Sequence, residues 1–141
     1  MADILDADGD IAKLRELFAV SLTGYWSTHY SFSGEPAASG ASQAIGRGAV
    51  DVILINTVVP LYYAYGTLTD NYGRVESATH ILEQLKPENN RITALFANAG
   101  LKIDNALASQ AAIQVRNEYC NPRKCLYCRV GHKLLSAAAF E

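Results

Sequence analysis

The run from Val50 to Tyr65 is apolar on every side, and such a run must be buried against other elements. Its β-branched residues allow a buried strand, but its length favours a central helix. Pro60 cannot donate to the carbonyl four residues earlier, so we expect a kink or a restart there, and Gly66 should end the helix. Asp51, Asn56 and Pro60 keep the run short of the roughly 18 uninterrupted apolar residues of a membrane span. We therefore predict a buried core helix and no membrane partner.

Apolar residues at helical spacing predict further helices on both sides of this run. Helix starts are expected where a short polar side chain can cap the first turn, at Asp8 or Asp10, at Asn89 or Asn90, and at Asp104. Helix ends are expected at Gly24, Pro87 and Gly100. With approximate ends, the predicted helices are 10–25, 50–65, 72–85, 90–100, 104–119 and 125–135.

The remaining sequence shows no internal repeat and no alternating strand pairs joined by hairpin turns. Residues 33–48 are rich in Gly, Ala and Ser and predict an internal flexible loop. A chain of 141 residues that is 50% hydrophobic and 18% charged is typical of one globular domain. We predict an all-α, single-domain array of five or six helices over residues 1–141, with a short cysteine-containing C-terminal segment.

Positive charge gathers near the C-terminus, in residues 116–135, which we call the basic Cys/His segment. This segment contains five cationic side chains and one carboxylate, Glu118, which gives a local charge of +4, whereas the whole chain carries −2. Such a patch attracts a polyanion locally, although a solvated helix face has the same composition. The candidate nucleic-acid-binding residues are Arg116, Arg123, Lys124, Arg129 and Lys133.

All three cysteines lie in the same segment, at Cys120, Cys125 and Cys128. Their number is odd, and the acidic N-terminus lacks the basic and apolar regions of a signal peptide. A disulfide-stabilised secreted protein is therefore not expected, and we predict a reducing, cytoplasmic setting.

With His132, the cysteines form the pattern C-x4-C-x2-C-x3-H, which supplies the four ligands of a structural zinc site. On a helix starting near Cys125, the side chains of Cys125, Cys128 and His132 would share one face, apart from the leucines. The candidate metal ligands are Cys120, Cys125, Cys128 and His132. Reduced cysteines packed in the core are the simpler alternative. An iron–sulfur cluster is a minor one, since the fourth cysteine of the ferredoxin pattern is missing.

Other site chemistries are weaker. Asp6, Asp8 and Asp10 look like the start of a calcium loop, but Ile11 and Leu17 occupy the positions that need Gly and Glu, so we reject calcium. A cysteine nucleophile would need a nearby base and an oxyanion hole, and nothing in the sequence marks the latter. There is no phosphate-binding glycine loop. We therefore expect no catalytic residues.

Four stretches resemble an uncharacterised bacterial family, domain of unknown function number 2851, frequent in Bacteroidetes. They lie within residues 17–30, 54–66, 87–92 and 109–135, the last being the most specific. Members are usually longer, and their N-terminal part looks like a divergent restriction-endonuclease-like nuclease. The resemblance implies that this chain is a C-terminal helical region lacking that part, so no nuclease role transfers to any residue here.

Together these observations predict a non-catalytic helical module that binds nucleic acid or a protein partner through the basic Cys/His segment, with either no cofactor or zinc. One alternative is a purely structural or assembly domain of a larger, nuclease-like protein, which includes self-association into a homo-oligomer. Another is a cysteine- or metal-dependent enzyme.

Overall fold

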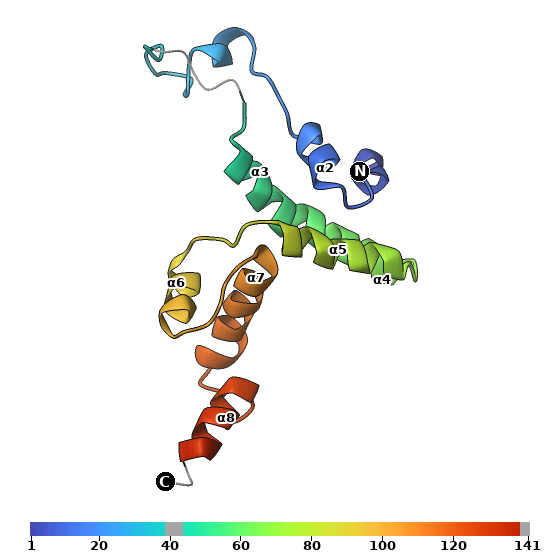
Figure 1. Ribbon diagram of the computed structural model, residues 1–141. Coiled ribbons are helices and arrows are strands. Elements are labelled where there is room, and N and C mark those ends of the chain that lie inside the picture. The colour runs from blue at the N-terminus through green and yellow to red at the C-terminus, as the bar shows by residue number, and fades with distance from the viewer. Residues whose placement is uncertain (39–43, 139–141) are drawn as a thin grey trace. The chain divides into compact units, whose positions relative to one another are not determined.

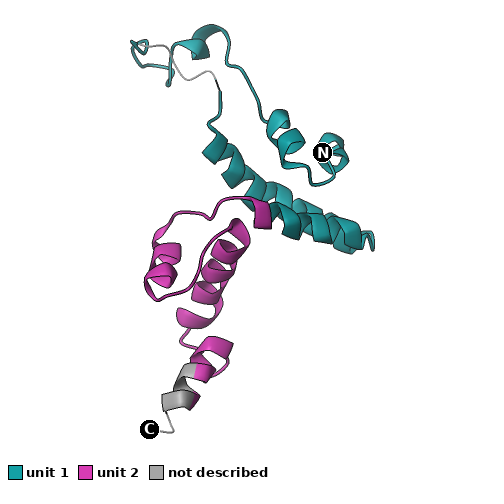
Figure 2. Cartoon of the chain, viewed as in Figure 1, with its two compact units in different colours: residues 1–82 teal, residues 83–141 magenta. Residues whose placement is uncertain are grey.

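The computed structural model describes residues 1–38 and 44–138, and no strand occurs in these ranges (Figure 1). The all-α prediction is therefore confirmed. The helices are α1 Ala2–Asp6, α2 Ile11–Leu17, α3 Arg47–Ile53, α4 Val59–Leu68, α5 Tyr72–Gln84, α6 Arg91–Asn98, α7 Ala106–Val115 and α8 Arg129–Ala138. Gly24–Ser27 (η1) is a 3₁₀ turn, and Leu54–Val58 (η2) and Arg116–Cys120 (η3) are π-helical. The structure divides into two compact units, residues 1–82 and 83–141 (Figure 2), and the single-domain organisation stays a prediction.

The predicted central helix is present and longer than expected. α3, η2 and α4 form one helix from Arg47 to Leu68, whose most apolar window has a mean hydropathy of 1.3. By length and composition this helix is able to cross a membrane, and the core helix of a soluble protein meets the same test. Its side chains Leu54, Val58 and Tyr62 are completely buried within the N-terminal unit. The helix is thus the centre of this unit's core.

The predicted restart at Pro60 takes the form of a π turn. η2 ends at Val58, and the N–H of Val59 bonds to the carbonyl of Leu54, five residues back. Pro60 then lies in the first turn of α4. Proline has no N–H to donate, but the wider π turn just before it has already interrupted the regular hydrogen bonds of the helix, so Pro60 removes no further bond.

Gly66 does not end the helix, contrary to prediction. It is buried inside α4, where an added Cβ would lie 2.9 Å from the Asn71 carbonyl oxygen and 2.9 Å from the Arg74 Cβ. Glycine is needed there because α4 and α5 approach closely. The helix ends at Leu68, and Asp70, with a φ of 51°, makes the left-handed turn that lets the Asn71 N–H reach the Gly66 carbonyl.

The first predicted helix, 10–25, is wrong in length. Asp10 caps α2 as predicted, accepting from the N–H groups of Ala12 and Lys13, but α2 ends at Leu17. Beyond it, Val20 and Leu22 are 51% and 39% exposed. These side chains have no surface to pack against, so a longer helix would gain no burial there and α2 does not extend to them. α1 was not predicted at all, because five residues carry no readable period.

A single buried side chain, Tyr62, ties the N-terminus of the chain to the central helix. Its hydroxyl accepts from the Gly9 N–H at 3.1 Å and donates to the Ile4 carbonyl. Two ion pairs lie nearby in the same unit, Arg15 with Asp51 at 2.7 Å and Arg74 with Asp8 at 3.1 Å. The acidic opening segment is thus partly neutralised by Arg74.

Polar caps organise the C-terminal unit. Asn90 caps α6 in a reciprocal capping box with Thr93, and Gly100 (φ 89°) closes the helix, as predicted. α7 is capped by Asn105, whose Oδ1 accepts from the Ala108 N–H at 2.9 Å. The predicted cap, Asp104, instead pairs with Lys102 at 2.5 Å. The two residues are adjacent, and sequence alone does not distinguish which of them has the extended backbone of a cap.

Candidate site in the C-terminal unit

The basic Cys/His segment begins with a tightly capped helix end. η3 continues α7, and three hydrogen bonds then close it, from the N–H groups of Asn121, Arg123 and Lys124 to the carbonyls of Arg116, Cys120 and Tyr119. The last two form the paired bonds of a Schellman cap, with Arg123 in the left-handed position at a φ of 56°. Glycine usually occupies this position, so the side chain of Arg123 is held there at some cost in backbone energy.

Cys125 and Cys128 lie in a turn and not on a helix, which corrects the predicted helix 125–135. The Cys128 N–H bonds to the carbonyls of Lys124 at 3.1 Å and Cys125 at 3.3 Å. α8 begins only at Arg129, and the His132 N–H bonds to the Cys128 carbonyl at 2.7 Å. The predicted shared helix face of Cys125, Cys128 and His132 therefore does not exist, because its first two members precede the helix.

Gly131 explains how this turn packs on the start of α8. A Cβ at position 131 would lie 2.5 Å from the Cys125 carbonyl oxygen, far inside contact distance. Only glycine therefore allows the backbone of the cysteine turn to rest on the first turn of α8.

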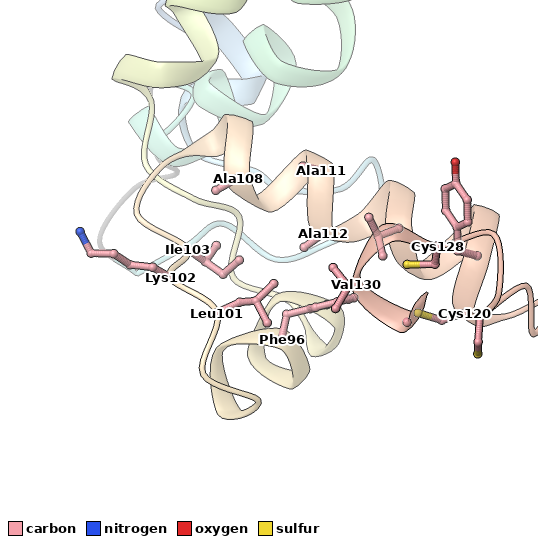
Figure 3. A pocket seen from close by; sticks show the side chains of 14 residues that line it. Phe96, Leu101, Lys102, Ile103, Ala108, Ala111, Ala112, Cys120, Cys128 and Val130 are labelled. Carbon is pink, nitrogen blue, oxygen red and sulfur yellow. The ribbon is translucent and has the colours of Figure 1, made fainter. Parts of the chain in front are cut away.

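An apolar pocket of about 430 Å³ lies between α6, α7 and the cysteine turn (Figure 3). Its walls include Phe96, Leu101, Val115 and Val130, together with all three cysteines. In Figure 3 the labelled cysteines occupy one end of the pocket, and Lys102, at the other end, extends away from it. The volume falls in the range of small-ligand sites.

The three cysteines are free thiols; Cys120 and Cys128 are half-buried and Cys125 is exposed. None of them is a fully buried core residue. His132 is exposed and does not line the pocket, and its Nδ1 lies 3.5 Å from the Ser136 hydroxyl. In the described part of the chain, no three His, Cys, Asp or Glu side chains come close enough to hold a metal ion. Zinc at Cys120, Cys125, Cys128 and His132 gains no support from this geometry and stays a prediction.

The five predicted nucleic-acid-binding residues all lie on η3, the following turns and α8. Arg123, Lys124, Arg129 and Lys133 are exposed, and Arg116 is half-buried. None of them pairs with a carboxylate within residues 1–38 or 44–138, whereas Arg15, Arg74 and Lys102 do. On α8, Arg129, His132, Lys133 and Ser136 have the i, i+3, i+4, i+7 spacing of a single helix face.

Lys102 lies at the edge of the pocket and pairs with Asp104. Its hydrogen bond with Asp104, and then the opposite charge of that carboxylate, raise the pKa of Lys102 above its ordinary value. Lys102 is fully exposed and already paired with Asp104, so we do not count it with the cations of the basic Cys/His segment.

Comparison with known proteins identifies a family for the N-terminal part of the chain. Residues 1–91 match a family described as a protein of unknown function, DUF2851. The chain belongs to this family. The match covers two of the four stretches that suggested the resemblance and nearly all of the third, and it ends before residues 109–135. Neither the curated proteins nor the solved structures contain a match. The site of this DUF2851 member thus lies outside the matched residues.

The apolar pocket was not predicted from the sequence. The feature that could have indicated it is the pair Phe96 and Leu101 on either side of Gly100, because a helix that ends at a glycine brings the apolar residues before and after that glycine into contact. The Leu101 N–H bonds to the Phe96 carbonyl at 3.0 Å and places both side chains on the pocket wall.

Proposed function

We propose that this DUF2851 member is a non-catalytic module that binds single-stranded nucleic acid through its basic Cys/His segment. The observation that carries the proposal is Tyr127, 82% exposed, on a turn that lies between the cations Lys124 and Arg129, neither of which pairs with a carboxylate of the described residues. An exposed phenol ring between cations offers a flat face on which a base can stack.

A shallow hollow lies beside Tyr127. It is lined by Gln114, Glu118, Tyr119, Lys124 and Tyr127 and encloses about 530 Å³. Two phenol rings, an amide and a carboxylate together offer stacking faces and both hydrogen-bond donors and acceptors to an unpaired base. This composition favours a base over a purely ionic ligand.

The remaining cations suit the phosphate backbone. Arg123 lies just before Lys124, and Arg129 and Lys133 lie on one face of α8. Cationic side chains that neutralise phosphates release counterions, so binding should weaken steeply with salt. Stacking on tyrosine is tolerant of sequence because every base has a flat face. We therefore expect affinity for single strands with little sequence preference.

Fluorescence anisotropy with labelled single-stranded and duplex oligonucleotides tests the proposal. Tyr127→Ala should weaken single-strand binding by about 1–3 kcal/mol, that is, roughly five-fold or more. Tyr127→Phe keeps the ring and should bind nearly as well as the parent chain.

A charge series tests the role of the cations at the phosphate backbone. Lys124→Gln with Arg129→Gln should lower the salt slope by about 0.7 for each phosphate of the single strand that the variant no longer neutralises. The matched control is Lys13→Gln with Lys86→Gln, which removes the same charge from two exposed lysines outside the segment. No binding at low salt, or an equal decrease in both double variants, would refute the proposal.

An assembly domain is the second candidate, favoured by exposed apolar side chains in the N-terminal unit. Phe32, Leu68 and Tyr72 are 86%, 84% and 76% exposed. Leu68 and Tyr72 flank the turn between α4 and α5, so they form one local apolar corner. Light scattering at increasing protein concentration distinguishes the candidates, because self-association would appear without nucleic acid and would be reduced by Leu68→Ser.

A further inference from the structure

Cys125 and Cys128 are the first and last residues of one hydrogen-bonded turn. We propose that Cys125 and Cys128 form an intramolecular disulfide by exchange with a low-molecular-weight disulfide of the glutathione class. This inference concerns covalent chemistry of the turn and does not depend on nucleic-acid binding.

The backbone places the two residues at the required separation. The bond from the Cys128 N–H to the Cys125 carbonyl, at 3.3 Å, closes a four-residue turn. Turns of this kind hold their first and last Cα atoms closer than about 7 Å. Disulfides usually join Cα atoms about 4.4–6.8 Å apart. The bond therefore needs side-chain rotation and little movement of the backbone.

The surroundings keep the turn in this shape. Gly131 lets the Cys125 carbonyl rest on the first turn of α8, and Cys128 donates to Lys124 as well as to Cys125. Both cysteines line the same pocket. Preorganisation of this kind favours closure within the turn over pairing with a second chain.

Exposure assigns the order of attack. Cys125 is exposed and Cys128 half-buried, so Cys125 meets the small disulfide first. The Cys125 thiolate attacks one sulfur of the reagent, forming a mixed disulfide and releasing one small thiol. The Cys128 thiolate then attacks the Cys125 sulfur, closing the protein disulfide and releasing the second small thiol. Two protein thiols are oxidised, and one reagent disulfide is reduced to two thiols that take up the protons.

Cys120 lines the same pocket and is the competing partner. It ends the π-helical turn η3, and the left-handed residue Arg123 reverses the chain between it and Cys125, so Cys120 is not part of the hydrogen-bonded turn that joins the other two. No backbone hydrogen bond of the described residues joins Cys120 to Cys125 or Cys128. We therefore expect Cys120 to remain a thiol while the pair oxidises.

Peptide mapping of the full chain tests the pairing. The reduced, chelator-treated protein is equilibrated with oxidised and reduced glutathione, alkylated and digested with trypsin. Cleavage after Arg123, Lys124 and Arg129 separates Cys120 from a peptide, residues 125–129, that holds both other cysteines. The expected result is an unalkylated 125–129 peptide lighter by two hydrogen atoms, with Cys120 alkylated.

Three variants make the assignment specific. Cys120→Ser should form the same light peptide, and Cys128→Ser should accumulate glutathione on Cys125. Cys125→Ser should abolish the light peptide. The inference is overturned if excess oxidised glutathione leaves the 125–129 peptide fully alkylated, or if the disulfide joins Cys120. If protein that has not been treated with chelator shows protection from alkylation without loss of mass, and the glutathione-treated sample forms no light peptide, the inference is overturned in favour of bound zinc.

Discussion

The two units are stabilised by different means. The N-terminal unit buries large side chains completely, namely Leu14, Leu54, Val58, Tyr62 and Ile81. In the C-terminal unit the only large side chain of this kind among the described residues is Leu85, and the other buried residues are Thr93, Ala106, Ser109 and Ala112. A unit held by caps and small residues can leave thiols, a tyrosine and cations at its surface. The proposed site therefore lies in the unit that has fewer large buried side chains among its described residues.

The largest predicted effect is in the N-terminal unit. Tyr62→Ala removes a fully buried ring and should cost about 3–5 kcal/mol of unfolding free energy. Tyr62→Phe loses only the hydroxyl, which bonds to Gly9 and Ile4, and should cost about 1–3 kcal/mol. Urea unfolding measures both, with hydrogen exchange following α1 and α2. Equal effects of the two variants would show that ring burial contributes little.

The matching test in the C-terminal unit is Ser109→Ala. The buried Ser109 hydroxyl donates to the Ala106 carbonyl at 2.8 Å and accepts from the Glu88 N–H at 3.2 Å. Removing it leaves both groups without this partner, so we expect a destabilisation of about 1–3 kcal/mol, localised by hydrogen exchange to α6 and α7. A substitution without effect would mean that this hydroxyl does not hold the unit together.

Helix capping predicts a smaller effect with its own control. Asn105→Ala removes the α7 cap and should cost about 1 kcal/mol. Asp104→Ala removes only an exposed pair with Lys102 and should change unfolding free energy far less. Thermal unfolding of the two variants, side by side, checks the assignment. The reverse order would restore Asp104 as the cap.

The smallest effect is expected at Arg123, whose φ of 56° favours glycine. Relief of left-handed strain, about 1–2 kcal/mol, is offset by the extra chain entropy of glycine, about 0.5–1 kcal/mol. Arg123→Gly should therefore stabilise the C-terminal unit by roughly half a kcal/mol. Hydrogen exchange at Lys124 should slow or stay the same. Faster exchange there would contradict the described cap.

Sequence reasoning predicted best where one residue determines one local structure. Asp10, Asn90 and Gly100 act as predicted, because caps depend on backbone geometry within one turn. It failed where tertiary packing decides. Gly66 is a helix interior residue because a neighbouring helix approaches it, and the first helix stops at Leu17 although its apolar spacing continues.

The metal ligands and nucleic-acid-binding residues expected in the basic Cys/His segment stay predictions. The cysteines do gather around one space, which the short spacing between them favours. The shared face of Cys125, Cys128 and His132 does not form, because the helix starts at Arg129. That start depends on hydrogen bonds from Cys128 to Lys124 and Cys125, and these cannot be read from residue types. The pocket is lined by side chains from several elements, so the pair Phe96 and Leu101 indicates only one of its walls.

The bonds of Tyr62 to the N-terminus have a consequence for biosynthesis. The hydroxyl reaches Ile4 across 58 positions and Gly9 across 53. During translation the opening residues therefore emerge long before their partner, and pairings this distant in sequence close late. The N-terminal unit completes its core only once α5, which carries the buried Ala78 and Ile81, has left the ribosome. The three cysteines are C-terminal to all of these residues, so the thiols are added after every part of that core has been synthesised.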